Sequence, residues 1–204
     1  SMKDLEIRGA GSLFGYKQSG HISSVGFEMY CNLLKSEVDL VMENSDDVRY
    51  PNIVFGEDAL INESYIENPT QRLEFYNHFS RAKTTKDVLK IKHDLKDRFG
   101  DLPVETKNLL FIAEARVLFK NAPVSRLSVD RVGVILVLDD IRPHSSLDKL
   151  FSAFDSFSRV EKVNHVFGKT KSGKLSVSFS AAGIVPSMRL LLKCSRLFLA
   201  VNNE

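Results

Sequence analysis

Residues 68–103 read NPTQRLEFYNHFSRAKTTKDVLKIKHDLKDRFGDLP, and this stretch carries the start signals of three helices. Proline suits the first turn of a helix, and a threonine just before a helix can cap its free N–H groups. The predicted helices run from Pro69 to about Lys83, from a cap at Thr84 or Thr85 to a stop at Gly100, and from Pro103 to about Asn121.

Apolar residues recur in these helices at three- and four-residue steps, so each helix should bury one face. The expected inward residues are Leu73, Tyr76 and Phe79 in the first helix, Val88, Leu89, Ile91, Leu95 and Phe99 in the second, and Leu109, Leu110, Ile112, Ala113, Val117 and Leu118 in the third.

Beyond the helices the pattern changes to strands. Apolar runs at 124–129 and 132–138 should pair as a hairpin around Asp130-Arg131, and runs at 160–167 and 175–179 should form a second pair. A helix capped by Ser145 or Ser146 lies between the two pairs, and Pro186 should open a last helix. The sequence therefore predicts an α+β fold with a small antiparallel sheet packed by several helices.

The first 44 residues differ from the rest. A glycine-rich loop follows a short helical stretch, and the later residues 23–42 carry an apolar stripe, which predicts a helical hairpin. Composition alone favours a plain connection between two helices, although the loop could instead aim Arg8 and Gln18 at a partner. Residues 44–47 read as a linker, 48–55 as an edge strand or extended arm, and 59–66 as a short helical turn. We therefore divide the chain into domains 1–44 and 45–204.

Composition excludes several classes of protein. The chain has 204 residues, 43% of them hydrophobic, and a formal net charge of +2, so the total charge points neither to nucleic acid nor to a membrane. Cys31 and Cys194 match no metal-ligand spacing and fit buried, reduced thiols. With no secretory signal and no heptad seam, we expect a cytoplasmic monomer with no membrane contact.

No catalytic constellation follows from residue spacing. The sequence has no phosphate-binding Gly-Lys-Ser/Thr loop and no acidic box for magnesium. Its histidines are scattered, and His93 cannot form a dyad with Asp94 because neighbours in a helix point apart. We expect no catalytic residue, metal site or cofactor in these 204 residues.

One acidic pair is unusual. Asp94 and Asp97 are three residues apart near the end of a predicted helix, where the terminal carbonyls disfavour negative charge. Lys90 and Arg98 can offset part of this cost, so a solvated face and a partner-binding pair remain equally good interpretations.

Two blocks resemble the transcription-repair coupling factor (Mfd) family. DLEIRGAGSLFG followed by QSGHISSVGFEMY resembles its translocation motif, which RecG shares more loosely; ESYIENPTQRLEFYNHFSRAKTTKDVLKIKHDLKDRFGDLPVETKNLL resembles the start of its C-terminal domain. The second match is strongest at RLEFY, AKT and DRFGDLP. The matched translocation-motif residues are Arg8, Gly9, Gly11, Gly15, Gln18 and Gly20.

This resemblance implies a function in bacterial transcription-coupled repair. In the family, an ATP- and Mg-dependent translocase acts on duplex DNA, removes stalled RNA polymerase and recruits excision repair. The resemblance implies that residues 1–44 couple ATP use to translocation, while 45–204 fold back on the N-terminal UvrB-like domain and mask the surface that recruits UvrA. Asp94 and Asp97 match acidic residues of that autoinhibitory contact.

Two other classes of function are alternatives. The basic residues of the β half could form a phosphate-contacting patch of a nucleic-acid-binding module if they converge. A metabolic enzyme has no supporting site in the sequence. The basic set is Arg126, Arg131, Arg142, Lys162, Lys169, Lys171 and Lys174.

Overall fold

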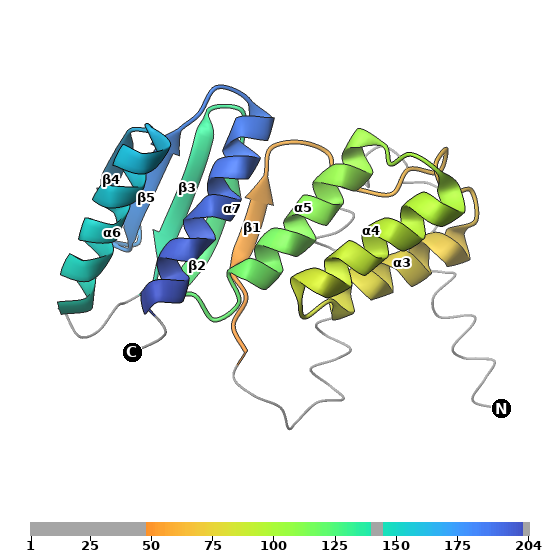
Figure 1. Cartoon of the computed structure of the whole chain (residues 1–204), viewed down its shortest axis with the longest axis horizontal. Helices are drawn as coiled ribbons and strands as arrows, with labels where there is room; N and C mark the ends of the chain where they lie inside the picture. Colours follow the sequence, from red (N-terminus) through yellow and green to blue (C-terminus); the bar gives the residue numbers. More distant parts are fainter. Residues whose placement is uncertain (1–47, 140–144, 202–204) are drawn as a thin grey trace.

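The computed structural model describes residues 48–139 and 145–201, and the predicted N-terminal hairpin, Cys31 and the translocation-motif residues lie outside this part (Figure 1). In chain order the elements are β1 (Asn52–Phe55), α3 (Pro69–Arg81), α4 (Thr85–Phe99), α5 (Val104–Leu118), β2 (Val124–Val129), β3 (Gly133–Leu138), α6 (Ser145–Glu161), β4 (His165–Lys169), β5 (Leu175–Ser180) and α7 (Ile184–Val201). The α+β prediction is confirmed.

Local signals set the ends of the helical elements. Asn68 caps α3 by accepting hydrogen bonds from the N–H groups of Thr70 and Gln71, with Pro69 in the first turn. Thr84 and Asp87 form a reciprocal capping box at the start of α4. Helix α4 ends at Gly100, whose φ of 84° favours glycine.

The sheet has the order β1-β2-β3-β5-β4. The predicted hairpins β2–β3 and β4–β5 are antiparallel, and β3 joins them by pairing antiparallel with β5. The predicted edge strand is present as β1, but it pairs parallel to β2, so the sheet is mixed rather than wholly antiparallel. A parallel pair needs a long crossover, and α3, α4 and α5 supply it.

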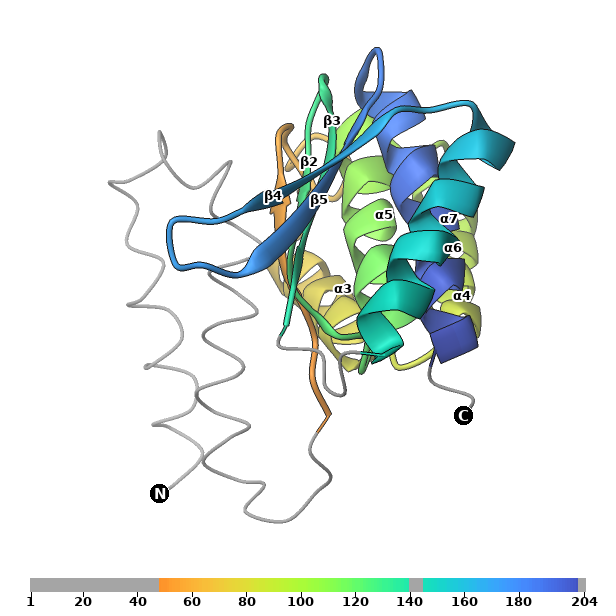
Figure 2. The same cartoon turned by 90° about the vertical axis from the view of Figure 1, so that its left-hand side faces the viewer.

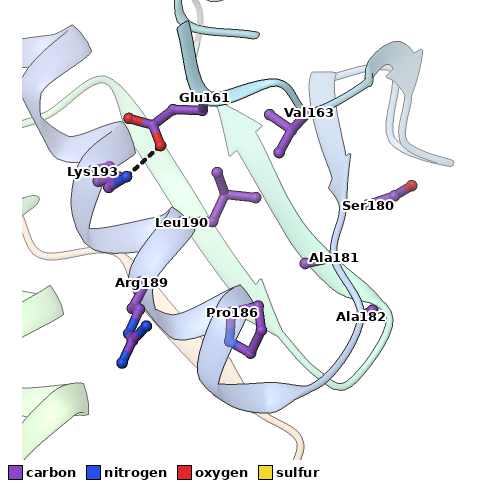
Figure 3. A pocket seen from close by; sticks show the side chains of 9 residues that line it. All are labelled: Glu161, Val163, Ser180, Ala181, Ala182, Pro186, Arg189, Leu190 and Lys193. Carbon is purple, nitrogen blue, oxygen red and sulfur yellow. Dashed lines mark hydrogen bonds and ion pairs between the residues drawn. The ribbon is translucent and has the colours of Figure 1, made fainter.

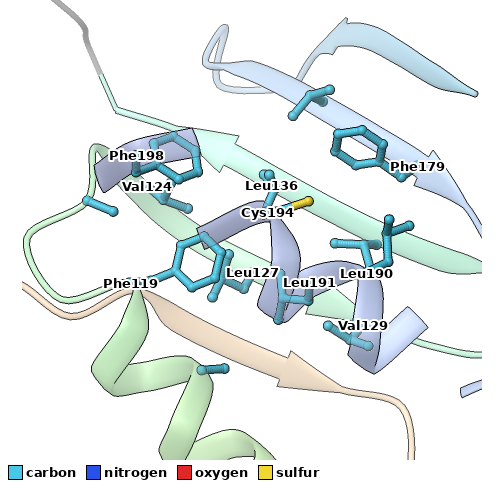
Figure 4. Packing of buried hydrophobic residues seen from close by; sticks show 14 of the residues in the cluster. Phe119, Val124, Leu127, Val129, Leu136, Phe179, Leu190, Leu191, Cys194 and Phe198 are labelled. Atoms are coloured by element: carbon cyan, nitrogen blue, oxygen red, sulfur yellow. The ribbon is translucent and has the colours of Figure 1, made fainter. Parts of the chain in front are cut away.

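The helices α5, α6 and α7 lie together on one face of the sheet (Figure 2). Their apolar side chains meet those of β2, β3 and β5 in the main core, which includes Phe119, Leu136 and Phe179 (Figure 4). Phe154 of α6 belongs to the same core. Cys194 is buried in this core, and burial raises the pKa of its thiol, which keeps it protonated and unreactive.

A second core joins α3, α4 and α5 beyond the β1 edge of the sheet (Figure 1). Helix α5 contributes to both cores: Phe111 and Ala115 belong to the main core at the sheet, whereas Leu109 and Leu110 belong to the core shared with α3 and α4. We call α3, α4 and α5 with their shared core the helical corner. Because α5 is buried on two sides, it connects this corner to the sheet.

Residues 59–66 contain the predicted short turn, at 63–65, where the N–H groups of Tyr65 and Ile66 donate to the Asn62 carbonyl (3.1 Å each). Thr106 and Asn108 of α5 donate side-chain hydrogen bonds to the carbonyls of Leu60 and Asp58 (3.3 and 2.8 Å) and hold the segment against that helix. Two other segments begin at residues that the sequence did not predict. The strand predicted from residue 160 begins only at His165.

Residues 160 and 161 extend α6 instead, and Lys162 leaves the helix with a φ of 55°. The last helix begins at Ile184, two residues before Pro186. The predicted inward set is wrong at Leu89 of α4, which is 51% exposed, and it misses Phe75 of α3, which is fully buried. Helical spacing alone does not decide which side of each helix is buried, and the packing of α3, α4 and α5 around one shared core does.

Candidate functional site

The predicted acidic pair lies on the last turns of α4. Asp97 is exposed and Asp94 is partly exposed. Across the described part of the chain, neither carboxylate has an ion pair or hydrogen-bond partner. Both therefore stand free at the end of a helix that disfavours negative charge.

Arg98 lies beside them and is held by aromatic rings. Its guanidinium carbon is 5.2 Å from the centre of the Phe75 ring and 5.1 Å from that of Phe99. Cation–π contacts of this kind favour a fixed position for the guanidinium while its N–H groups remain available. The sequence predicted that Arg98 would offset the acidic charge here, but it did not predict that Arg98 would stack on Phe75.

Tyr65 fixes the end of α4 from outside the helix. Its hydroxyl lies 3.1 Å from the Leu95 carbonyl and 3.2 Å from the Gly100 carbonyl, so it can donate to either one and tie the segment before α3 to the end of α4. Burial, and secondarily the charge of Asp101, raise the pKa of Tyr65, so the hydroxyl keeps its proton. Sequence spacing could not reveal this residue, because its contacts are 30 and 35 positions away.

The α4 end is thus a positioned charged surface, defined by Asp94, Asp97, Arg98 and Asp101. Asp101 has a loose ion pair with Lys96, at 3.8 Å between Nζ and Oδ1. A partner with complementary charge would carry more basic than acidic side chains, because this surface offers unpaired carboxylates beside one stacked arginine. They offer no buried acid or base and no enclosed space for a reaction.

The basic residues of the β half do not converge. Arg131 lies in the β2–β3 turn and pairs with Glu57, at the same end of the sheet as Lys162. Lys169, Lys171 and Lys174 are at the opposite end, in the β4–β5 hairpin, where Lys174 pairs with Asp139 at 3.1 Å. Arg126 lies on β2 between them, and Arg142 is outside the described residues. The basic residues that the structure describes therefore do not come together in a single phosphate-binding patch.

The structure does bring three polar residues together that spacing did not. His165 Nδ1 is 2.7 Å from the Ser158 hydroxyl, and its Nε2 is 3.2 Å from Asp155 Oδ1. The ring also packs edge-on against Phe167, at 5.0 Å between centroids. Since Asp155 and Ser158 belong to α6 and His165 to β4, this cluster ties the helix to the outer strand.

A shallow pocket of about 290 Å³ lies between the end of α6 and the start of α7 (Figure 3). The ion pair between Glu161 and Lys193 lies at its edge, and Val163, Ala181 and Leu190 form much of its wall. Within residues 48–139 and 145–201, no three side chains of the ligand types are grouped to hold a metal ion. No described helix is long and apolar enough to cross a membrane.

Comparison with known proteins identifies the domain. The family model of the TRCF domain matches residues 55–148, which run from the last residue of β1 through the α4 end and the β2–β3 hairpin to the start of α6. Residues 55–148 are therefore similar to a TRCF domain. The resemblance predicted from RLEFY, AKT and DRFGDLP is therefore confirmed.

The curated relatives agree with this assignment. The chain is 28% identical over its full length to the transcription-repair-coupling factor of Staphylococcus aureus strain USA300 and covers 18% of that protein. It is 26% identical to that of Borreliella burgdorferi, over 82% of this chain and 17% of the relative. The chain thus spans less than a fifth of the length of these relatives.

The fold matches that of a solved C-terminal domain of a transcription-repair coupling factor. The crystal structure of the C-terminal domain of a transcription-repair coupling factor superposes with a TM-score of 0.62 and 16% identity, over 76% of this chain and 96% of that chain. The TRCF domain of this chain therefore has the same arrangement of mixed sheet and helices.

Proposed function

We propose that this chain is the C-terminal part of a transcription-repair coupling factor, and that its TRCF domain acts as a latch. The α4 end would bind the N-terminal UvrB-like domain of the same protein and so mask the surface that recruits UvrA. The observation that carries the proposal is the pair of unpartnered carboxylates, Asp94 and Asp97, on a helix end held rigid by Tyr65.

The energetics suit a contact that must open. Exposed ion pairs contribute less than about 1 kcal/mol each and are screened by salt. Two carboxylates and one stacked arginine would therefore hold the domain closed only weakly. A competing partner or a change in the translocase could then release it.

The finer roles of the remaining chain follow from the same resemblance. Residues 1–44, with Arg8 and Gln18 in the translocation motif, would couple ATP use by the parent protein to movement on duplex DNA. ATP and Mg, and the contact with RNA polymerase, would belong to other parts of that parent. In this proposal the chain itself contributes restraint rather than catalysis.

The test is binding of the 204-residue chain to the isolated UvrB-like domain of its own parent protein, across a salt series. Asp94→Asn/Asp97→Asn should weaken binding about tenfold at low salt, equivalent to about 1.4 kcal/mol, and should flatten the salt dependence. A charge-matched control, Asp58→Asn/Asp148→Asn, removes two exposed carboxylates away from the α4 end and should leave the affinity unchanged.

Equal weakening by both double variants would show a general charge effect and overturn the latch. Absence of binding to the UvrB-like domain, together with salt-dependent binding to duplex DNA, would favour the nucleic-acid-binding module instead.

A further inference from the structure

The shallow pocket between the end of α6 and the start of α7 has an apolar wall and a charged rim (Figure 3). Charged side chains from the two helices stand around residues that have no polar side-chain atoms. These apolar lining residues are Val163, Ala181, Ala182, Pro186 and Leu190. A concave apolar surface with a few charged groups at its edge is typical of a recognition site.

Exposed apolar residues lie beside this pocket. Among the described residues, the two most exposed large apolar side chains are Val160 (76%) and Val132 (74%). Val160 precedes the lining residue Glu161, and the Val132 carbonyl accepts a hydrogen bond from the N–H of the lining residue Ala181 (2.9 Å). Single exposed valines are ordinary, but a group of them next to a pocket marks an interaction surface. We call this pocket, with Val132 and Val160 beside it, the α6–α7 pocket.

The rim of the α6–α7 pocket has an excess of positive charge. Glu161 pairs with Lys193, so these two charges compensate each other. Arg189 has no ion pair or hydrogen-bond partner among residues 48–139 and 145–201, and its side chain extends away from Glu161 (Figure 3). Lys162 follows Glu161 in the chain, is exposed, and has no ion pair within the same residues. Two free cations at the rim favour a partner that carries carboxylates.

The acids of the neighbouring β2–β3 turn are engaged within the fold. The Gly183 N–H donates to the Arg131 carbonyl (2.8 Å), which places this turn next to the start of α7. Arg131 pairs with Glu57, and the Asp130 carboxylate accepts hydrogen bonds from two N–H groups of its own turn (2.8 and 3.0 Å). The two rim cations have no such partners in the part of the chain that the structure describes.

We propose that the α6–α7 pocket binds an acidic peptide segment of a partner protein, which inserts one large apolar side chain into the pocket. An open pocket of about 290 Å³ lies just below the usual range of about 300–1,000 Å³ for sites that enclose a small molecule. It suits one anchor side chain, and a few such anchors carry most of the free energy of a protein–protein contact. Carboxylates next to the anchor would face Arg189 and Lys162.

Nucleic acid fits this surface less well than an acidic peptide does. A phosphate backbone would meet the two cations but also the carboxylate of Glu161. Single-stranded nucleic acid is ordinarily bound on aromatic rings, and none of the residues that line the pocket is aromatic. The apolar wall would therefore remain unused.

The α6–α7 pocket is separate from the α4 end. Helices α6 and α7 cover the sheet, whereas α4 belongs to the helical corner beyond the β1 edge (Figure 1). A segment bound in the pocket would not need the surface that the latch uses. The two proposals therefore rest on different residues, and either can fail without the other.

A phage-displayed library of random peptides, selected on the 204-residue chain, tests the proposal. The enriched peptides should share one large apolar residue with aspartate or glutamate close to it. A synthetic peptide of the enriched sequence should bind more weakly as salt is added. Replacing its apolar anchor with alanine should weaken binding by more than about fivefold, and replacing its acids with the corresponding amides should have a similar effect.

Variants of the chain locate the site. Arg189→Glu should weaken binding of the synthetic peptide about tenfold, because it reverses the free charge at the rim. Ala182→Arg should weaken it to a similar extent, because a long side chain would occupy the pocket. The matched controls, Arg196→Glu on α7 and Ser152→Arg on α6, change exposed residues that do not line the pocket and should leave the affinity unchanged. Far-UV circular dichroism and urea unfolding would confirm that each variant is folded.

Four outcomes would overturn the proposal. The first is a selection that enriches no sequence, or only sequences without an acidic residue. The second is an affinity that Ala182→Arg does not change, or that the control variants lower equally. The third is binding of duplex DNA that Arg189→Glu abolishes, without binding of any peptide. The fourth is self-association that Ala182→Arg abolishes, which would make a second copy of the chain the occupant.

Discussion

The helical corner and the sheet half of this domain bury their apolar residues in different ways. In the corner, α3, α4 and α5 enclose a core of their own, and the outer side of α4 is charged. In the sheet half, the helices cover one face and leave the other lined by valine, isoleucine and serine. Within residues 48–139 and 145–201, the corner therefore presents charge on its outer side, whereas the sheet has one covered and one uncovered face.

The difference affects the kind of contact that each region can make. A charged helix end supports a weak and salt-sensitive contact that can open, as the latch requires. The uncovered face of the sheet mixes valine and isoleucine with serine and carries Asn52 and Arg126, so it has no comparable group of carboxylates.

The largest expected effect tests whether the two regions are one folding unit. Phe75→Ala removes a fully buried ring from the corner and should lower the free energy of unfolding by about 3–5 kcal/mol. The matched change in the sheet half, Phe154→Ala, should cost a similar amount. Because α5 contributes to both cores, urea unfolding should show a single transition in each variant.

Two separate transitions, with Phe75→Ala shifting only one of them, would show that the corner unfolds by itself. The comparison would then be between two independent subdomains, and α5 would have to belong to one of them.

A smaller effect sharpens the description of the sheet. A Cβ added at Gly133 would lie 2.0 Å from the Phe179 carbonyl oxygen on the neighbouring strand, so Gly133→Ala must displace β3 from β5. Overpacking of this kind costs about 1–3 kcal/mol. Gly173→Ala is the control, since Gly173 also has a positive φ but a Cβ there would meet nothing within 4 Å. Equal losses in thermal stability for Gly133→Ala and Gly173→Ala would show that backbone strain, and not the close approach of β5, accounts for the glycine at position 133.

The smallest effect concerns the start of α4 in the corner. Thr84→Ala removes half of the capping box and should cost about 1 kcal/mol at neutral pH. Hydrogen bonds from the Lys83 N–H and from Thr84 lower the pKa of Asp87. A lowered pKa in the folded state means that Asp87 stabilises the fold above its ordinary pKa, and that this contribution is lost as the pH falls through the lowered value.

Urea unfolding at neutral and acidic pH would check the sign. The stability difference between the wild type and Asp87→Asn should shrink as the solution is acidified. A difference that grows toward acid would contradict the assigned direction. The sheet half offers Glu57 as a comparison, because its pKa is lowered by Arg131 rather than by backbone N–H groups.

Part of the candidate site was predictable from spacing alone. Asp94 and Asp97 share one side of α4 because three residues make nearly one helical turn, and that relation needs no tertiary information. The residues that hold them in place were not predictable. Tyr65 reaches the end of α4 from a segment that had been expected to be helical, and Phe75 stacks on Arg98 from a different helix.

By itself the sequence determined the features that depend on near neighbours: the caps at Asn68 and Thr84, the stop at Gly100, and the turns of the two hairpins. Each of these involves hydrogen bonds or backbone angles within a few residues. Tertiary structure alone decided the parallel pairing of β1 with β2, the burial of Phe75 in α3, the exposure of Leu89 in α4, and which face of the sheet the helices cover. Those choices depend on burying apolar area between residues that are distant in sequence, and local periodicity is the same for each alternative.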